Sequence, residues 1–189
     1  MVLTHASNLS ERALDVDWDG TNQAALLSGE VLVKTKPHSS CGGAVTARIY
    51  LPMTRSLVWQ KLTNYSRWAY YFPDLVHSEL LARGDGSSNS AKRLYQVGRK
   101  AFLIFTAQVE IYLKVFETLH QSIQFRFERG SFNDFSADLK LQDCGDGTVL
   151  SYSVQAIPTI PVPSAFIQQA MHIDLPNNLR QLRKVISGM

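Results

Sequence analysis

The sequence is poor in cysteine and contains no long apolar run. Its two cysteines, Cys41 and Cys144, each precede a glycine in a predicted loop, without the Cys or His spacing that a zinc site needs. No apolar run reaches the roughly 18 to 20 residues of a membrane-spanning helix, and the N-terminus lacks the basic and then apolar order of a signal peptide. We therefore expect free thiols, no metal ion, no cofactor, and a protein that is soluble and cytoplasmic.

The sequence also lacks a strong charge bias. Its 19 basic and 16 acidic residues give a formal net charge of +3, and they are spread along the chain rather than gathered into runs. Such a distribution is typical of an ordinary solvated surface and gives only weak support for an anionic partner. Contact with nucleic acid or a ribosome is therefore a minor alternative, as is transient contact with a membrane surface.

What the sequence does contain is a repeated alternation of apolar and polar residues. It is found in the segments 44–51, 103–115, 123–127, 135–141 and 150–156. This period of two predicts strands with one apolar face and one polar face. Strands are also predicted at 29–35, 76–84 and 92–99, and "DCGDGT" (residues 143–148) is typical of a hairpin turn.

The C-terminal segment predicts the element that covers this sheet. From Ser164 to Ser187 the apolar residues recur at steps of three and four, as in an amphipathic helix, and Pro176 should kink that helix. We predict an α+β fold in which a curled antiparallel sheet of about seven strands wraps around a long C-terminal helix. Two short helices follow the first strand, residues 1–28 form a mobile arm, and residues 29–189 form the domain.

This order of elements resembles the helix-grip fold of the START-like superfamily, which includes polyketide cyclases/dehydrases and coenzyme Q-binding proteins. The stretch "VWQKLTNYSRWAYYFPDLVHSELL" (residues 58–81) is similar to the superfamily's opening signature. The motifs "YQVG", "GDGTVLSYSV" and "IDLPNNLRQLRK" are similar to the versions found in cyanobacteria and plant chloroplasts. The resemblance covers residues 29–187 and implies an internal cavity more firmly than it implies a reaction.

The resemblance also indicates which residues would line such a cavity. Trp68, Tyr71, Phe72 and Leu75 would form part of its mouth, although they could instead simply fill the core. The inward strand and helix positions complete the predicted ligand-binding set: Phe105, Ala107, Val109, Phe125, Phe127, Tyr152, Met171 and Leu175. Because none of these residues is charged, the lining would bind an apolar ligand. A fully packed interior without a cavity is the alternative.

The function that we expect is binding of a hydrophobic small molecule, such as a quinone, a lipid or another isoprenoid or polycyclic compound, by a carrier or chaperone. The first alternative is a polyketide cyclase/dehydratase, for which Tyr152 and His172 are the only catalytic candidates. A single histidine at the edge of a helix's apolar face is more often a boundary residue than an acid or base. The second alternative is a ribosome-associated protein, because some START-like relatives act at the ribosome.

Overall fold

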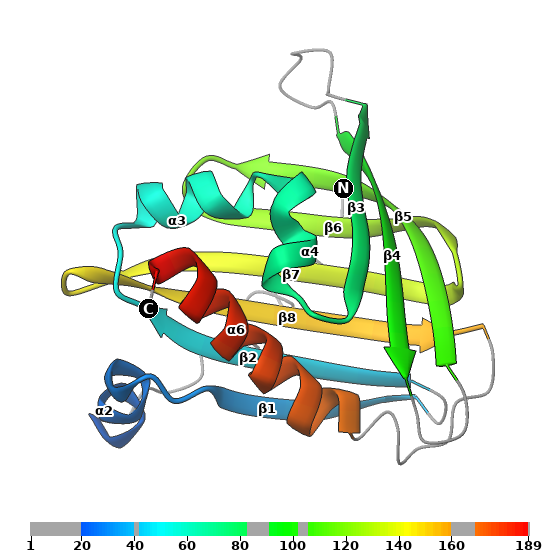
Figure 1. Cartoon of the computed structure of the whole chain (residues 1–189). Helices are drawn as coiled ribbons and strands as arrows, with labels where there is room; N and C mark the ends of the chain where they lie inside the picture. The colour runs from blue at the N-terminus through cyan, green and yellow to red at the C-terminus, as the bar shows by residue number, and fades with distance from the viewer. Residues whose placement is uncertain (1–19, 40–41, 83–90, 102–105, 160–168, 189) are drawn as a thin grey trace, which may run out of the picture.

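The computed structural model describes residues 20–39, 42–82, 91–101, 106–159 and 169–188. Across these residues the chain forms one antiparallel sheet with the strand order β1-β2-β8-β7-β6-β5-β4-β3. Its strands, shown in Figure 1, are β1 (Leu32–Ser39), β2 (Gly42–Leu51), β3 (Leu75–Ala82), β4 (Lys92–Ala101), β5 (Thr106–Thr118), β6 (Ser122–Gly130), β7 (Phe132–Cys144) and β8 (Gly147–Pro158). The described sheet has eight strands where about seven were expected, and β1, which contains most of the strand predicted at 29–35, pairs with β2 at the edge of the sheet.

One face of the sheet is apolar and buried. The register places Ala47 and Ile49 of β2 opposite Tyr152 and Leu150 of β8, so that the alternating apolar residues share one side. Residues of this inner face that are almost fully buried include Val45, Ala47, Ile49, Leu51, Leu94, Leu113, Val115, Ile123, Phe125, Ala137, Leu139 and Leu150. The strands predicted from alternation are confirmed, except that residues 102–105 of the longest one lie outside the described residues.

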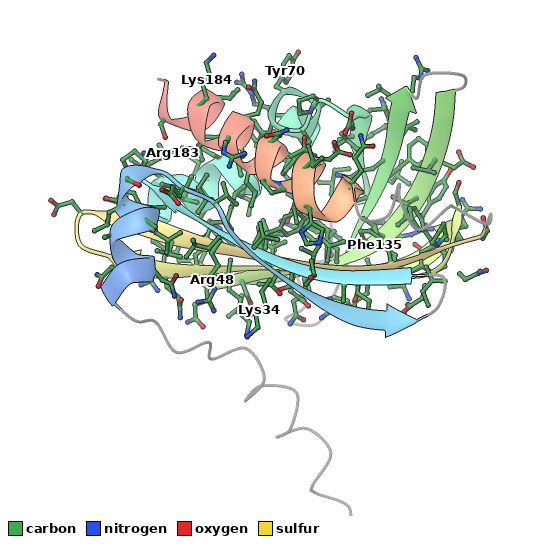
Figure 2. All side chains as sticks on the ribbon, turned by 90° about the horizontal axis from the view of Figure 1, so that it is seen from below. Lys34, Arg48, Tyr70, Phe135, Arg183 and Lys184 are labelled. Atoms are coloured by element: carbon green, nitrogen blue, oxygen red, sulfur yellow. The ribbon has the colours of Figure 1, made fainter. Side chains whose placement is uncertain are left out.

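Helices cover the apolar face from the same side. The predicted short pair comprises α3 (Arg55–Leu62) and α4 (Trp68–Tyr71), joined by a 3-10 turn (Tyr65–Arg67). The C-terminal helix α6 (Leu175–Ser187) buries Leu175, Leu179, Leu182 and Ile186. Figures 1 and 2 show α3, α4 and α6 on one side of the sheet. Among the described residues, none of the helices has the length and hydropathy of a membrane span.

The beginning of α6 differs from a regular helix. A π-helical turn (Ala170–Asp174) precedes α6, and Pro176 lies in the first turn of α6. Proline has no N–H to donate to the carbonyl four residues earlier, and its ring clashes with that carbonyl. The irregularity predicted at Pro176 therefore takes the form of a wider turn just before it. Residues 164–168, the predicted start of the helix, lie outside the described residues.

A further helix lies in the segment predicted to be a mobile arm. Helix α2 (Gly20–Ser28) buries Leu26, which is 2% exposed. At its end, the Arg183 guanidinium of α6 occupies the space where a side chain at Gly29 would lie, and Figure 2 shows Arg183 on this side of α6. Residues 20–29 thus pack against the domain, whereas residues 1–19 lie outside the described part.

The covering role of α6 can be tested with two substitutions on opposite sides of the helix. Leu182 is fully buried, whereas Val185 is 37% exposed. We expect Leu182→Ala to lower the free energy of unfolding by about 2 to 5 kcal/mol, because it leaves a cavity under the helix. Val185→Ala should change it by less than about 0.5 kcal/mol. Urea denaturation followed by circular dichroism measures both, and equal losses would contradict the described packing.

Candidate functional site

A chain of aromatic rings links the short helices to the inner face of the sheet. The Trp68 ring centroid lies 5.2 Å from that of Phe72 and 5.1 Å from that of Phe125 on β6. Tyr65 lies 5.8 Å from Trp68, and Phe72 lies 6.4 Å from Tyr152 on β8. Tilted and edge-to-face ring pairs attract each other beyond the apolar area that they bury. The helical segment is thereby attached to two strands that are not neighbours in the sheet.

Hydrogen bonds fix the polar atoms of this aromatic cluster. Trp68 Nε1 donates to the Leu62 carbonyl at the end of α3, at 2.8 Å. The Tyr65 hydroxyl donates to Glu117 Oε1 at 2.5 Å, and Lys92 Nζ donates to the same oxygen at 2.6 Å. Burial, together with the hydrogen bond to Glu117, raises the pKa of Tyr65, so its hydroxyl stays neutral and continues to donate. These contacts hold the rings in one orientation and make the cluster a rigid support.

The structure places most of the predicted cavity mouth in the core. Trp68, Tyr71 and Phe72 are 4%, 2% and 8% exposed, and Leu75 at the start of β3 is half-buried against the core. The exposed ring of this segment is Tyr70, at 68%. Figure 2 shows Tyr70 on the side of the helices that faces away from the sheet. The aromatic segment therefore fills one end of the interior.

Tyr152 has a different environment. It lies on the inner face opposite Ala47 of β2 and Leu139 of β7, both almost fully buried. Burial raises the pKa of the Tyr152 hydroxyl to about 12, yet the side chain remains partly exposed. No hydrogen bond joins this hydroxyl to another of the described residues. A deep, partly accessible hydroxyl that bonds to none of the described residues is suited to hydrogen-bond a ligand inside the fold.

The inner face changes from fully to partly buried at the level of Tyr152. Strand β8 is buried from Gly147 to Ser151 and half-buried from Tyr152 to Pro158. On the neighbouring β7, Phe135 is half-buried as well, and Figure 2 labels it on the sheet. Val109, Phe127 and Val154 are also half-buried, although their strand positions face inward. We take these residues, together with Tyr152, as the candidate ligand-binding surface and call it the inner apolar surface.

The remaining predicted site residues fall into three groups. Phe125 and Leu175 are 2% and 9% exposed and belong to the packed core. Phe105 lies outside the described residues, and the side chains of Ala107 and Met171 are not described either, although the first lies on β5 and the second on the π-helical turn. His172 is exposed on that turn, so it lacks the buried setting that usually tunes a catalytic acid or base.

A polar pair on the inner face was not predicted from the sequence. Ser78 of β3 lies opposite Gln96 of β4, and Gln96 Nε2 donates to Ser78 Oγ at 3.1 Å. The two residues are 7% and 8% exposed. Their position in the strand alternation could have revealed them. Ser78 stands two residues from Leu80 on β3, and Gln96 stands two residues from Leu94 on β4, so each shares the inward side of its strand with a leucine of the core. Polar residues at apolar positions of a strand indicate either a functional site or a packing exception.

The described residues offer no metal centre. No group of three or more His, Cys, Asp or Glu side chains among them is placed to hold a metal ion. Cys144 is a free, half-buried thiol at the β7–β8 hairpin, and Cys41 lies outside the described part. The charged side chains instead form pairs at or near the surface, such as Arg93 with Glu128 at 2.8 Å and Arg126 with Asp138 at 2.8 Å.

Several solved structures share this fold. A START superfamily protein from Mycobacterium smegmatis has a TM-score of 0.60 and 14% identity, with 77% of this chain and 94% of that chain covered. The STAR-related lipid transfer protein from Xanthomonas axonopodis has a TM-score of 0.58 and 15% identity, with 82% and 98% covered. The Zhui aromatase/cyclase from Streptomyces sp. R1128 has a TM-score of 0.60 and 14% identity, with 78% and 93% covered.

At these identities the structural likeness establishes the helix-grip architecture of the START-like proteins and nothing finer. No curated protein sequence matches this chain significantly. The family model described as polyketide cyclase / dehydrase and lipid transport matches residues 51–183, from the end of β2 to the last turns of α6. This match spans more than half of the sequence and all the strands that carry the inner apolar surface. The chain therefore belongs to the polyketide cyclase/dehydrase and lipid transport family.

Proposed function

We propose that this protein binds a hydrophobic small molecule between the inner apolar surface and the C-terminal helix, as a carrier or chaperone. The observation that carries the proposal is the setting of Tyr152. Its hydroxyl lies deep enough for burial to raise its pKa to about 12, whereas the side chain is still partly exposed. In a solidly packed interior, such a side chain would be fully covered or hydrogen-bonded.

The chemistry of the surrounding side chains supports an apolar ligand. Phe127, Phe135 and Val154 contribute only rings and methyl groups to the inner apolar surface. Apolar walls with a few convergent polar groups are typical of sites for small hydrophobic molecules. A quinone, a lipid or another isoprenoid or polycyclic compound has this chemistry. The family's description includes lipid transport, and one protein with the same fold is a lipid transfer protein.

The proposal predicts that the protein carries its ligand through purification. We expect native mass spectrometry of the protein from its own host to show an added mass at a stoichiometry of about one, as for a single enclosed site. Denaturation should release a compound that can be extracted into an apolar solvent. A protein without added mass, which also fails to take up apolar compounds from a host extract, would contradict the proposal.

A second test places a larger side chain in the proposed binding site. Val154 is half-buried on the inner face of β8, whereas Val185 is 37% exposed on α6. Val154→Phe should weaken binding of the fluorescent probe 1-anilinonaphthalene-8-sulfonate by about tenfold or more, equivalent to about 1.4 kcal/mol, because the added ring takes the ligand's volume. Val185→Phe should leave the affinity unchanged. Thermal melting of both variants excludes unfolding as the cause, and equal affinities would place the probe elsewhere.

A cyclase/dehydratase activity is the second candidate, favoured by the same Tyr152 hydroxyl. With its pKa raised to about 12, this hydroxyl is neutral near pH 7 and can donate a hydrogen bond or a proton, but it cannot serve as a base. We expect the protein to return a bound poly-β-ketone unchanged, as judged by mass spectrometry against a buffer control. Conversion that is lost in Tyr152→Phe and in His172→Ala would overturn the carrier assignment and establish the enzyme.

A further inference from the structure

The Ser78–Gln96 pair lies in apolar surroundings on the inner face of the sheet. Ser78 and Gln96 occupy the same side of their strands as Leu80 and Leu94, and Ile111 of β5 lies directly opposite Gln96. Burying an amide and a hydroxyl among such residues costs free energy that a single hydrogen bond only partly offsets. Two apolar side chains of similar size would stabilise this part of the core at least as well. Stability therefore does not account for the pair.

Most of the pair's hydrogen-bonding capacity is unused. A glutamine amide has two N–H donors and an acceptor oxygen, and a serine hydroxyl can donate as well as accept. The bond from Gln96 Nε2 to Ser78 Oγ uses one amide donor and one hydroxyl lone pair. Among the described residues, no second hydrogen bond involves either side chain. Within the described part of the chain, the Ser78 O–H and the Gln96 Oε1 thus have no partner and remain available to another molecule.

The next inward position on β4 is covered by a side chain of the neighbouring strand. Gly98 follows Gln96 by two residues and contributes no side chain, and a methyl group there would lie 3.2 Å from Val109 Cγ2. Val109 belongs to the half-buried inner apolar surface. The row from Gln96 through Gly98 to Val109 therefore connects the polar pair with the surface on which the ligand is proposed to lie.

We propose that Ser78 and Gln96 recognise a neutral carbonyl or hydroxyl oxygen on an otherwise apolar ligand. This inference rests on the proposed function and specifies the ligand class for the same site. The pair can donate to and accept from such an oxygen. It has no charge to balance a carboxylate or an amine, and its neighbours Leu80, Leu94 and Ile111 would desolvate a charged group without compensation.

The proposal is tested with two probes that differ by one hydroxyl, 2-naphthol and naphthalene, titrated against the full-length protein by fluorescence. We expect the wild-type protein to prefer 2-naphthol by about five- to tenfold, the range that one net hydrogen bond provides. The double variant Ser78→Ala/Gln96→Met should lose this preference while binding naphthalene as well as before. Met matches Gln in shape, so the melting temperature should stay within a few degrees of the wild-type value.

A matched control is available on the opposite face of the same sheet. Thr46 and Ser153 form a cross-strand hydrogen bond of 2.9 Å between β2 and β8. Thr46→Val/Ser153→Ala removes this outward-facing pair and should leave the preference for 2-naphthol intact. If the inward double variant melts far lower, Ser78→Ala alone replaces it, because that change removes a single hydroxyl oxygen.

The outcomes separate this inference from the proposed function. Failure of the wild-type protein to bind either probe would contradict both. Binding of both probes with a preference that survives in the inward variant, or a wild-type protein without a preference, would overturn the role of Ser78 and Gln96 and leave the carrier function standing. Loss of the preference in the inward variant alone would establish the pair as the element that recognises the ligand's oxygen.

Discussion

The structure depends on one constraint, which is that an antiparallel sheet with a single apolar face must have that face covered. Alternation along the strands places most of the large apolar side chains of the sheet on one side, and exposing that side to water would cost more free energy than a domain of this size can lose. Helix α6 covers part of the face with Leu175, Leu179, Leu182 and Ile186. The α3–α4 segment covers another part with its aromatic rings.

The two covers differ in how completely they exclude other molecules. Around Trp68, rings from helix and sheet are in mutual contact, and hydrogen bonds to Leu62 and Glu117 fix their polar atoms. Beyond Tyr152, β7 and β8 present inward-facing residues that are only half-buried. A rigid, filled end beside a partly covered end is an arrangement suited to holding a ligand, because the filled end maintains the fold while the other end keeps inward-facing side chains accessible.

Among the described residues, the polar groups on the inner face are few, neutral and incompletely hydrogen-bonded. Tyr152 on β8 and the Ser78–Gln96 pair on β3 and β4 belong to this group. Charged side chains, in contrast, pair with one another near the surface or, as with Lys92 and Glu117, brace the aromatic cluster. Because the helix-grip fold supports both transfer proteins and cyclases, the choice between those functions rests on these polar groups.

The sequence by itself determined the strands, the β7–β8 hairpin and the apolar side of α6, because these depend on local periodicity and turn chemistry. It did not determine whether Trp68, Tyr71 and Phe72 are buried in the core, since aromatic residues occur both in packed cores and in cavity walls. Nor did it identify the Ser78–Gln96 pair. The tertiary structure decided these points, because the strand register and the seating of α4 on the sheet depend on contacts between residues far apart in the chain.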